Sequence, residues 1–422
     1  MKFKITKDFP YQFLFALCIG VTYINIYELT FAVWLFTIAL TIKKKYSYTL
    51  LRYILPYFFI LFIAFVSFFF YDNTIYAAIR DVTYLIKPII GFIVGYQLCN
   101  SYKCNPYKTI IYTGLVIALI HLGILLFNLV FHRITQMHEL RRLTGYFSDF
   151  EIYALIVVQF HKQLNVELNK KKFWLLIFII GLSSFLYLSR TNFIQYAILL
   201  IAMKGYLTLT KKSAKVILIT ILITAIGYTF VYNTNPRRNG KGLEALLYKI
   251  KNAPIEPFKT KINKDDYEDF NDNYRSFENI KAIKQVSLEG TSGILFGKGL
   301  GSSIDIGREM YTNDETFVRY EPILHNAYMT VFLKSGLLGV FFIFYFLYYL
   351  FKQSKSDIEV VKQVNLLLIG TAFFLIVANW VLLGLFLKLD NKSIVIGFLL
   401  CYKELNIKQN QFCIFFILIL KR

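Results

Sequence analysis

Residues 109–131 read TIIYTGLVIALIHLGILLFNLVF, a stretch without a single Asp, Glu, Lys or Arg side chain. A helix needs about 20 mostly apolar residues to cross the hydrocarbon core of a bilayer, and this stretch is long enough. Over the whole chain 56% of residues are hydrophobic and only 17% are charged, whereas soluble domains are about 25% charged. The composition therefore excludes a soluble globular domain and predicts an integral membrane protein.

Similar apolar stretches on both sides of this one predict an all-α membrane protein with about twelve transmembrane helices. The predicted spans are 11–25, 28–42, 51–71, 84–99, 109–131, 150–166, 173–189, 191–207, 215–233, 326–350, 364–386 and 390–402. The chain then divides into spans 1–9 (residues 1–233), a large extracytoplasmic loop (234–325), spans 10–12 (326–402) and a cytoplasmic tail (403–422). The apolar run 411–420 is too short to cross a bilayer and is expected to lie against it.

The net charge of +21 is concentrated in the short segments between spans. The lysines that mark these segments are Lys2, Lys4, Lys7, Lys43, Lys44, Lys45, Lys103, Lys108, Lys170, Lys171, Lys172, Lys211, Lys212, Lys215, Lys352, Lys355, Lys403 and Lys408. A twelve-span topology puts all of them on the cytoplasmic side, as the positive-inside rule requires. Residues 236–325 instead hold 14 Lys or Arg and 14 Asp or Glu, so this segment is neutral and is expected outside. The basic excess reflects topology and gives no reason to infer a nucleic-acid partner.

The cysteines predict neither disulfides nor a structural metal site. They are Cys18, Cys99, Cys104, Cys401 and Cys413, and they form no CxxC or Cys/His pattern. All of them are expected in spans or on the inner side, where thiols stay reduced.

The outer segment 234–325 contains one clear helical pattern and one glycine-rich turn. Apolar residues recur with a three-residue spacing from Phe277 to Val286, which predicts an amphipathic helix with Arg275 at its start. The following ILFGKGLGSSID (294–305) lacks the Lys-Ser/Thr pair that ends a nucleotide-binding loop. Close backbone packing is the expected role of these glycines.

Four segments resemble, in order along the chain, motifs of the O-antigen ligase and polymerase superfamily of bacterial surface-polysaccharide assembly. They are RRLTGYFSDFEIYA (141–154), LSRTNFIQYAILL (188–200), Arg275 with FGKGLG (296–301), and HNAYMTVFLKSGLLG (325–339). The resemblance covers the whole topology and is sharpest from 141 to 339. One departure is Glu151, where many members carry Asn or Asp, and this departure bears on contacts with the acceptor.

Members of this superfamily transfer a saccharide from undecaprenyl diphosphate to a hydroxyl group, outside the bacterial cytoplasmic membrane. Arginine suits a diphosphate because its planar guanidinium donates bidentate hydrogen bonds, and histidine suits the base that activates the hydroxyl. The resemblance implies that Arg190 and Arg275 bind the diphosphate and that His325 is the catalytic base. The residues alone also fit an anchoring interfacial Arg190, a solvated Arg275, and an exposed His325 that precedes an Asn cap.

Secondary candidates for contacts with the donor or acceptor are Arg142, Arg80, Lys87, Asn326 and Lys334. Arg80 and Lys87 are seven residues apart and so share one face of a helix. Lys87 lies at the start of the fourth span, where an ionisable residue suggests a function, although a snorkelling side chain also fits. Arg142 suits a carrier phosphate or an anionic lipid headgroup, and Lys334, within the tenth span, is expected to face a wet cavity. His121, alone in the fifth span, is expected to be structural.

The resemblance thus implies an inverting glycosyltransferase that polymerises undecaprenyl-diphosphate-linked repeat units and needs neither a metal nor a cofactor. The alternatives are an O-antigen ligase that uses lipid A-core as acceptor, a protein O-oligosaccharyltransferase, and a polysaccharide flippase without enzymatic activity. The expected partners are the lipid-linked glycan, membrane lipids and a chain-length regulator, with no nucleic acid.

Overall fold

A computed structural model describes residues 8–43, 46–101, 106–134, 136–145, 147–207, 210–240, 243–263, 265–311, 317–353 and 356–420. The predictions made for Lys2, Lys4, Lys7, Lys44, Lys45, Lys103, Lys355 and Cys104 lie outside these residues, as do the side chains of Lys212 and Cys413.

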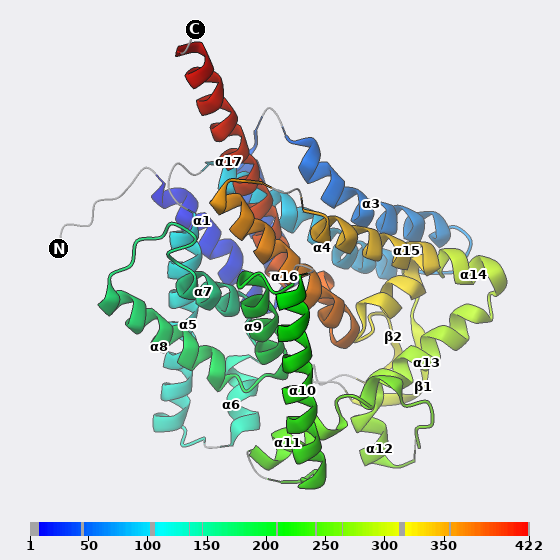
Figure 1. The fold of residues 1–422 in the computed structure, drawn as a ribbon. Coiled ribbons are helices and arrows are strands. Elements are labelled where there is room, and N and C mark those ends of the chain that lie inside the picture. Colours follow the sequence, from blue (N-terminus) through cyan, green and yellow to red (C-terminus); the bar gives the residue numbers. More distant parts are fainter. Residues whose placement is uncertain are drawn as a thin grey trace.

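Helices make up most of the structure, and every predicted span overlaps one of them (Figure 1). They are α1 (Phe9–Gly20), α2 (Tyr27–Thr41), α3 (Tyr48–Phe68), α4 (Ile75–Ser101), α5 (Tyr107–Phe131), α7 (Asp149–Gln159), α8 (Lys170–Leu186), α9 (Arg190–Met203), α10 (Lys211–Asn233), α15 (Ala327–Phe351), α16 (Glu359–Val381) and α17 (Lys392–Leu420). Shorter pieces are η1 (Val21–Ile24), α6 (Met137–Thr144) and η3 (Gly384–Phe386). Within the described residues, six helices are long and apolar enough to cross a membrane, namely α3, α4, α5, α10, α15 and α16. The protein is therefore membrane-embedded and mostly α-helical.

Several helices differ in length from the predicted spans. The sixth predicted span, 150–166, is helical only as far as Gln159, and a turn with Asn165 at positive φ follows. The resulting 11-residue helix α7 rises only about 17 Å at 1.5 Å per residue, roughly half of a bilayer core. At the other end of the chain, α17 does not stop at the predicted boundary near 402 but continues to Leu420.

The centre of the bundle is the close crossing of α4 and α17. Gly95 of α4 allows this approach, since a Cβ atom there would lie 2.0 Å from the backbone oxygen of Ile394. Phe92, Ile394 and Phe398 on the two helices are completely buried. Helix α10 is instead mostly exposed. Only 6% of its 18-residue apolar stretch is buried in the protein, whereas the corresponding share is 28–67% in the other five helices of spanning length.

Residues 243–321, within the segment that is predicted to lie outside, form a small layer at one end of the bundle, called the outer layer below. It consists of α11 (Leu243–Asn252), η2 (Glu256–Phe258), α12 (Tyr267–Asp272), α13 (Tyr274–Ser287), α14 (Gly290–Phe296) and a hairpin of β1 (Ile304–Tyr311) and β2 (Phe317–Glu321). Figure 1 shows α11 and α12 at the lower end of the view, the hairpin above them beside α13, and the C-terminal end of α17 at the upper end. The predicted amphipathic helix is confirmed as α13, with Phe277 and Val286 buried.

The antiparallel hairpin was not predicted from the sequence. Its strands pair with Ile304 opposite Glu321 and Tyr311 opposite Phe317, with an irregularity between Asp305 and Met310. Buried Ile304 packs with Val286 of α13 and Leu324, so the hairpin closes the outer layer and directs the chain back to α15.

Candidate active site

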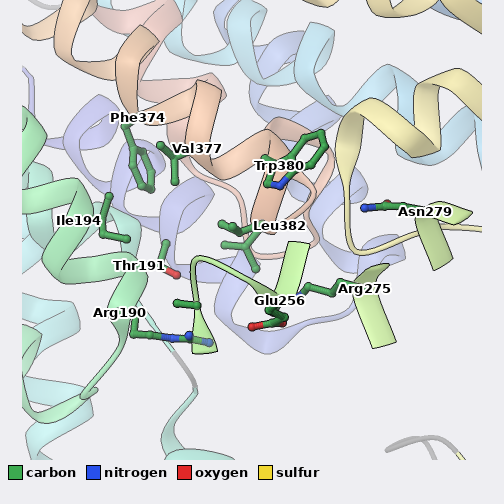
Figure 2. Close-up of a pocket in the computed structure, with 12 residues that line it drawn as sticks. Arg190, Thr191, Ile194, Glu256, Arg275, Asn279, Phe374, Val377, Trp380 and Leu382 are labelled. Atoms are coloured by element: carbon green, nitrogen blue, oxygen red, sulfur yellow. Dashed lines mark hydrogen bonds and ion pairs between the residues drawn. The ribbon is translucent and has the colours of Figure 1, made fainter. Parts of the chain in front are cut away.

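Two predicted residues that lie far apart in the sequence, Arg190 and Arg275, line the same pocket (Figure 2). The pocket lies where the outer layer meets the bundle, between α9, α16, α13 and the η2 region. Arg190 is the first residue of α9, so the unpaired N–H groups and the positive dipole end of this helix lie beside the pocket. Arg275 comes from the first turn of α13.

The two arginines share a single pocket-lining carboxylate among the described residues. The guanidinium of Arg275 lies 3.3 Å from Glu256 Oε1, with the two side chains 31% and 18% exposed. Arg190 Nη1 donates a hydrogen bond of 2.7 Å to the backbone oxygen of Lys249. Figure 2 shows Glu256 between the two arginines, with Arg190 on one side and Arg275 on the other.

More positive charge gathers around this pocket than the sequence indicated. The charges of Arg275 and Arg141 both act on Arg190. The pKa of Lys249 is lowered by partial desolvation and by the positive charges of Arg141 and Arg190. Four cations therefore lie close enough to act on one another, and the carboxylates of Glu256 and Asp272 oppose their charges.

The inner wall of the pocket is apolar. Ile194 from α9, Phe374, Val377 and Trp380 from α16, and Leu382 line it. Figure 2 shows these side chains on the bundle side and the arginines on the outer side. The enclosed volume is about 120 Å³. A charged rim above an apolar wall suits an amphiphile whose anionic head binds the rim.

A fully buried glutamate, Glu278, holds His325. Glu278 Oε2 accepts a 3.0 Å hydrogen bond from the backbone N–H of His325, and its Oε1 lies 3.0 Å from His325 Nδ1. The histidine side chain is 53% exposed, whereas the glutamate side chain is completely buried. Because Nδ1 faces the carboxylate, it carries the proton and leaves Nε2 as the acceptor.

Glu278 was not predicted from the sequence, where only its spacing from Arg275 could have indicated it. Glu278 follows Arg275 by three residues, so both lie on one face of α13. The structure buries Glu278 completely, although acidic side chains are rarely buried unless they are paired. What the sequence does not carry is the pairing with His325, which lies 47 residues further along.

His325 is not among the residues that line the arginine pocket, but the backbone on its C-terminal side is hydrogen-bonded to one of them. Asn326 caps α15 by accepting from the N–H of Met329 at 3.2 Å. The next N–H, that of Ala327, donates to the backbone oxygen of Leu382, which lines the pocket. On the other side, α13 supplies Arg275 to the pocket and Glu278 to the histidine.

The charges around His325 favour its protonated form. Partial desolvation lowers the pKa of His325, but the hydrogen bond to Glu278 and the charges of Glu278 and Glu321 outweigh it and raise the pKa above its usual value. Burial and the charge of Glu278 raise the pKa of Glu321 to about 7, against the opposing charges of His325 and Arg80. Three titratable groups are thus coupled at the end of β2.

Most secondary candidates lie elsewhere. Lys334 is buried in α15, where its Nζ lies 2.5 Å from Asp81 and also bonds to the backbone oxygen of Ser302. Arg80 pairs with the same Asp81 at 3.1 Å. Lys87 is buried in α4 and donates to two backbone carbonyls of the segment before α17, Leu387 at 2.7 Å and Asp390 at 3.0 Å.

Arg142 and Glu151 are also outside the pocket lining. Arg142 is exposed on α6, and its neighbour Arg141 is the residue whose charge reaches Arg190. Glu151 is fully buried and accepts a 3.2 Å hydrogen bond from Tyr187. The ring of Tyr187 stacks on His121 at 3.8 Å, so His121 belongs to the same internal cluster.

The glycine-rich turn packs on the bundle, as predicted. The N–H groups of Lys298 and Gly299 donate to the backbone oxygens of Leu333 and Lys334 at 2.8 and 3.1 Å. Gly299 has φ +77, and a Cβ atom there would lie 2.4 Å from the backbone nitrogen of Phe68. This contact fixes the start of β1, and with it the hairpin that leads to His325.

A second, larger pocket of about 590 Å³ lies between α3 and α14. It is lined mainly by apolar side chains, among them Phe62, Val66 and Phe296. Its carboxylate, Glu289, pairs with Lys298 at 2.8 Å. Its larger volume makes this pocket a candidate ligand site, but Arg190 and Arg275 both line the smaller pocket.

Among the described residues, no group of three or more His, Cys, Asp or Glu side chains is placed to hold a metal ion. No family model, curated protein or solved structure matches the chain. The resemblance to the O-antigen ligase and polymerase superfamily therefore stays a prediction.

Proposed function

We propose that this protein is a membrane glycosyltransferase that uses polyprenyl-diphosphate-linked glycans as donors, in the manner of an O-antigen or capsular polysaccharide polymerase. The observation that carries the proposal is the convergence of Arg190 and Arg275 on one pocket with an apolar wall, beside a histidine held by a buried glutamate. Each part of this site matches one part of the reaction.

In the proposed reaction the donor diphosphate binds between Arg190 and Arg275, and the polyprenyl chain extends along the apolar wall. The arginines donate hydrogen bonds to the phosphate oxygens, and these bonds strengthen as the leaving group gains negative charge. Guanidinium groups stay protonated at all relevant pH values, so this stabilisation needs no proton transfer.

His325 acts as the base in the same step. Its Nε2 accepts the proton of the acceptor hydroxyl, while the hydroxyl oxygen forms a bond to the anomeric carbon of the donor. The bond from that carbon to the diphosphate oxygen breaks, and the electron pair leaves with the polyprenyl diphosphate. A single displacement inverts the anomeric configuration. Glu278 orients the imidazole and stabilises the positive charge that forms on it.

The proposal includes a topology with about twelve crossings, in a bacterial cytoplasmic membrane, and with the pocket outside. The opposite placement of the outer layer and the C-terminal end of α17 in Figure 1 supports it. Labelling of Leu288→Cys by a membrane-impermeant maleimide in intact cells tests this sidedness, because Leu288 is 85% exposed on the outer layer. Labelling only after the membrane is opened would contradict the topology.

A purified-component assay tests the activity. The full-length protein in lipid nanodiscs should convert undecaprenyl-diphosphate-linked repeat units into longer lipid-linked glycans and release undecaprenyl diphosphate, in the presence of excess chelator. The proposal includes metal independence because arginines can supply the required positive charge. Absence of elongated product, or elongation that magnesium restores after chelation, would contradict it.

A further inference from the structure

One segment of the chain, residues 243–258, contacts both arginines of the pocket. This segment comprises α11 and η2 and is called the pocket latch below. Its Lys249 carbonyl accepts a hydrogen bond from Arg190 at 2.7 Å, and its Glu256 carboxylate lies 3.3 Å from Arg275. One N–H donor of each guanidinium is therefore already engaged by an oxygen of the latch.

The latch also contacts the apolar wall. Phe258 at its end stacks on Trp380 of the pocket lining, with ring centroids 5.9 Å apart. The Phe258 side chain is 71% exposed, so this contact is a loose one at the surface. The latch thus contacts the charged rim and the apolar wall of the same pocket.

The latch is joined to α10 on one side and to α12 on the other. It follows α10, which is only 6% buried and packs on α11 rather than on the bundle. Tyr228 of α10 donates to the Lys251 carbonyl at 2.9 Å and joins the two helices. Beyond the latch, Lys259 pairs with Asp269 and anchors the chain to α12. Displacement of the latch would break its contacts with Arg190 and Trp380 of the bundle, and the hydrogen bonds that join Tyr248 to Asp272 and Ser276 to the backbone oxygen of Glu256.

We propose that Glu256 is an internal counter-ion that occupies the arginine pocket until the diphosphate of a lipid-linked donor displaces it. This inference rests on the proposed function, since the displacing ligand is the donor of that reaction. Glu256 then determines which anions bind. A singly charged ligand merely exchanges one monoanion for another at Arg275, whereas a diphosphate brings further charge that also reaches Arg190.

The first test compares the affinity of undecaprenyl diphosphate for the wild type, Glu256→Gln and Glu244→Gln, measured by calorimetry on the full chain in nanodiscs. Gln removes the competing charge, so Glu256→Gln should bind roughly five- to tenfold more tightly. Glu244 lies on the same latch and pairs with Arg237, which precedes the latch. Because Glu244 does not line the pocket, its substitution is the matched control. Unchanged or weaker binding by Glu256→Gln overturns the inference.

The second test needs no ligand. Spin labels are placed at Ile255→Cys on the latch and Leu288→Cys beyond α13, which are 54% and 85% exposed, in a chain whose five native cysteines are replaced by serine. Pulsed electron resonance then measures the distance between the labels. Glu256→Gln should add a longer population, and Glu244→Gln should leave the distribution unchanged.

The two tests separate this inference from the proposed function. If neither the wild type nor Glu256→Gln binds undecaprenyl diphosphate, the proposed function fails and the role of Glu256 as a counter-ion to a donor fails with it. If binding occurs and Glu256→Gln leaves both the affinity and the label distance unchanged, the latch inference alone is overturned.

Discussion

The cations inside the bundle and the cations at the outer pocket are held in different ways. Within the bundle, Lys334 pairs with Asp81 at 2.5 Å and is almost completely buried, and Lys392 pairs with Asp149 and Asp390. At the outer pocket, Arg190 and Arg275 are partly exposed and share the carboxylate of Glu256.

This difference separates structural from ligand-binding charge. A buried cation with its own partner is internally compensated, and removing one partner costs stability because the other is left as an unpaired buried charge. Cations that converge with fewer carboxylates repel one another and favour an anionic ligand. A lysine in a predicted span is therefore a weaker functional candidate here than an arginine at its outer end.

The largest effect on activity is expected at the base. His325→Ala should lower the rate of transfer by about 10²- to 10⁴-fold, the usual contribution of a general base, and leave donor affinity near that of the wild type. Single-turnover kinetics and equilibrium binding on the same preparation measure the two quantities. A His325→Ala enzyme with near-normal turnover would exclude the proposed role.

The next largest effect is expected at the pocket arginines. Arg190→Lys and Arg275→Lys should each lower kcat/KM by roughly 30- to 1000-fold, or about 2–4 kcal/mol, because lysine has no planar fork. The matched control is Arg319→Lys, which alters a similar pair with Asp305 in the hairpin. Equal losses in all three variants would assign the effect to folding of the outer layer.

A pH profile should reveal the glutamate behind the histidine. Neutral His325 is the active form. Because the pKa of His325 is raised, wild-type activity should begin to fall at a pH above about 6.5, the ordinary histidine pKa, as the pH is lowered. Glu278→Gln removes the main interaction that raises this pKa, so the acid limb should move to lower pH, and kcat should fall roughly 10- to 100-fold. An unmoved limb would show that Glu278 is only structural.

Glu321 should give a smaller shift of the same sign. Its charge also raises the pKa of His325, but it contributes less than Glu278. Glu321→Gln should therefore move the acid limb slightly downward and leave kcat at the optimum almost unchanged. A shift to higher pH would contradict the arrangement of charges described for this end of β2.

The smallest effect on specific activity is expected at the buried lysine. Lys334→Met alone should lower the yield of folded protein, since it removes the buried partner of Asp81 and leaves only the partly exposed Arg80 paired with it, at a cost of up to about 3–5 kcal/mol. The double variant Asp81→Asn/Lys334→Met should recover yield, and its activity per folded molecule should match the wild type. A large loss of kcat in well-folded double variant would place Lys334 among the functional residues.

The sequence predicted features that depend on local composition. Apolar runs located the helices, the spacing from Phe277 to Val286 located α13, and the glycines of 294–305 indicated close packing. Arg190, Arg275 and His325 were selected by the resemblance, and the structure brings the two arginines, but not His325, into one pocket.

The missed features depend on contacts between distant segments. The contact between Glu278 and His325 joins residues 47 positions apart, and the spacing of apolar residues in the sequence does not predict such a contact. Lys334 was predicted to face a wet cavity because the sequence does not show that it pairs with Asp81, which lies in a different helix. The hairpin was missed because β1, IDIGREMY, has a glycine and an irregular register in place of strict alternation.

Photocrosslinking tests the location of the donor most directly. An undecaprenyl diphosphate that carries a diazirine close to the diphosphate is irradiated with the full-length protein, and modified peptides are identified by mass spectrometry. The account predicts modification at the apolar wall of the arginine pocket, on α9 near Ile194 and on α16 near Val377, and loss of this signal in Arg275→Lys. Modification confined to the larger pocket between α3 and α14, near Phe62 and Phe296, would contradict it.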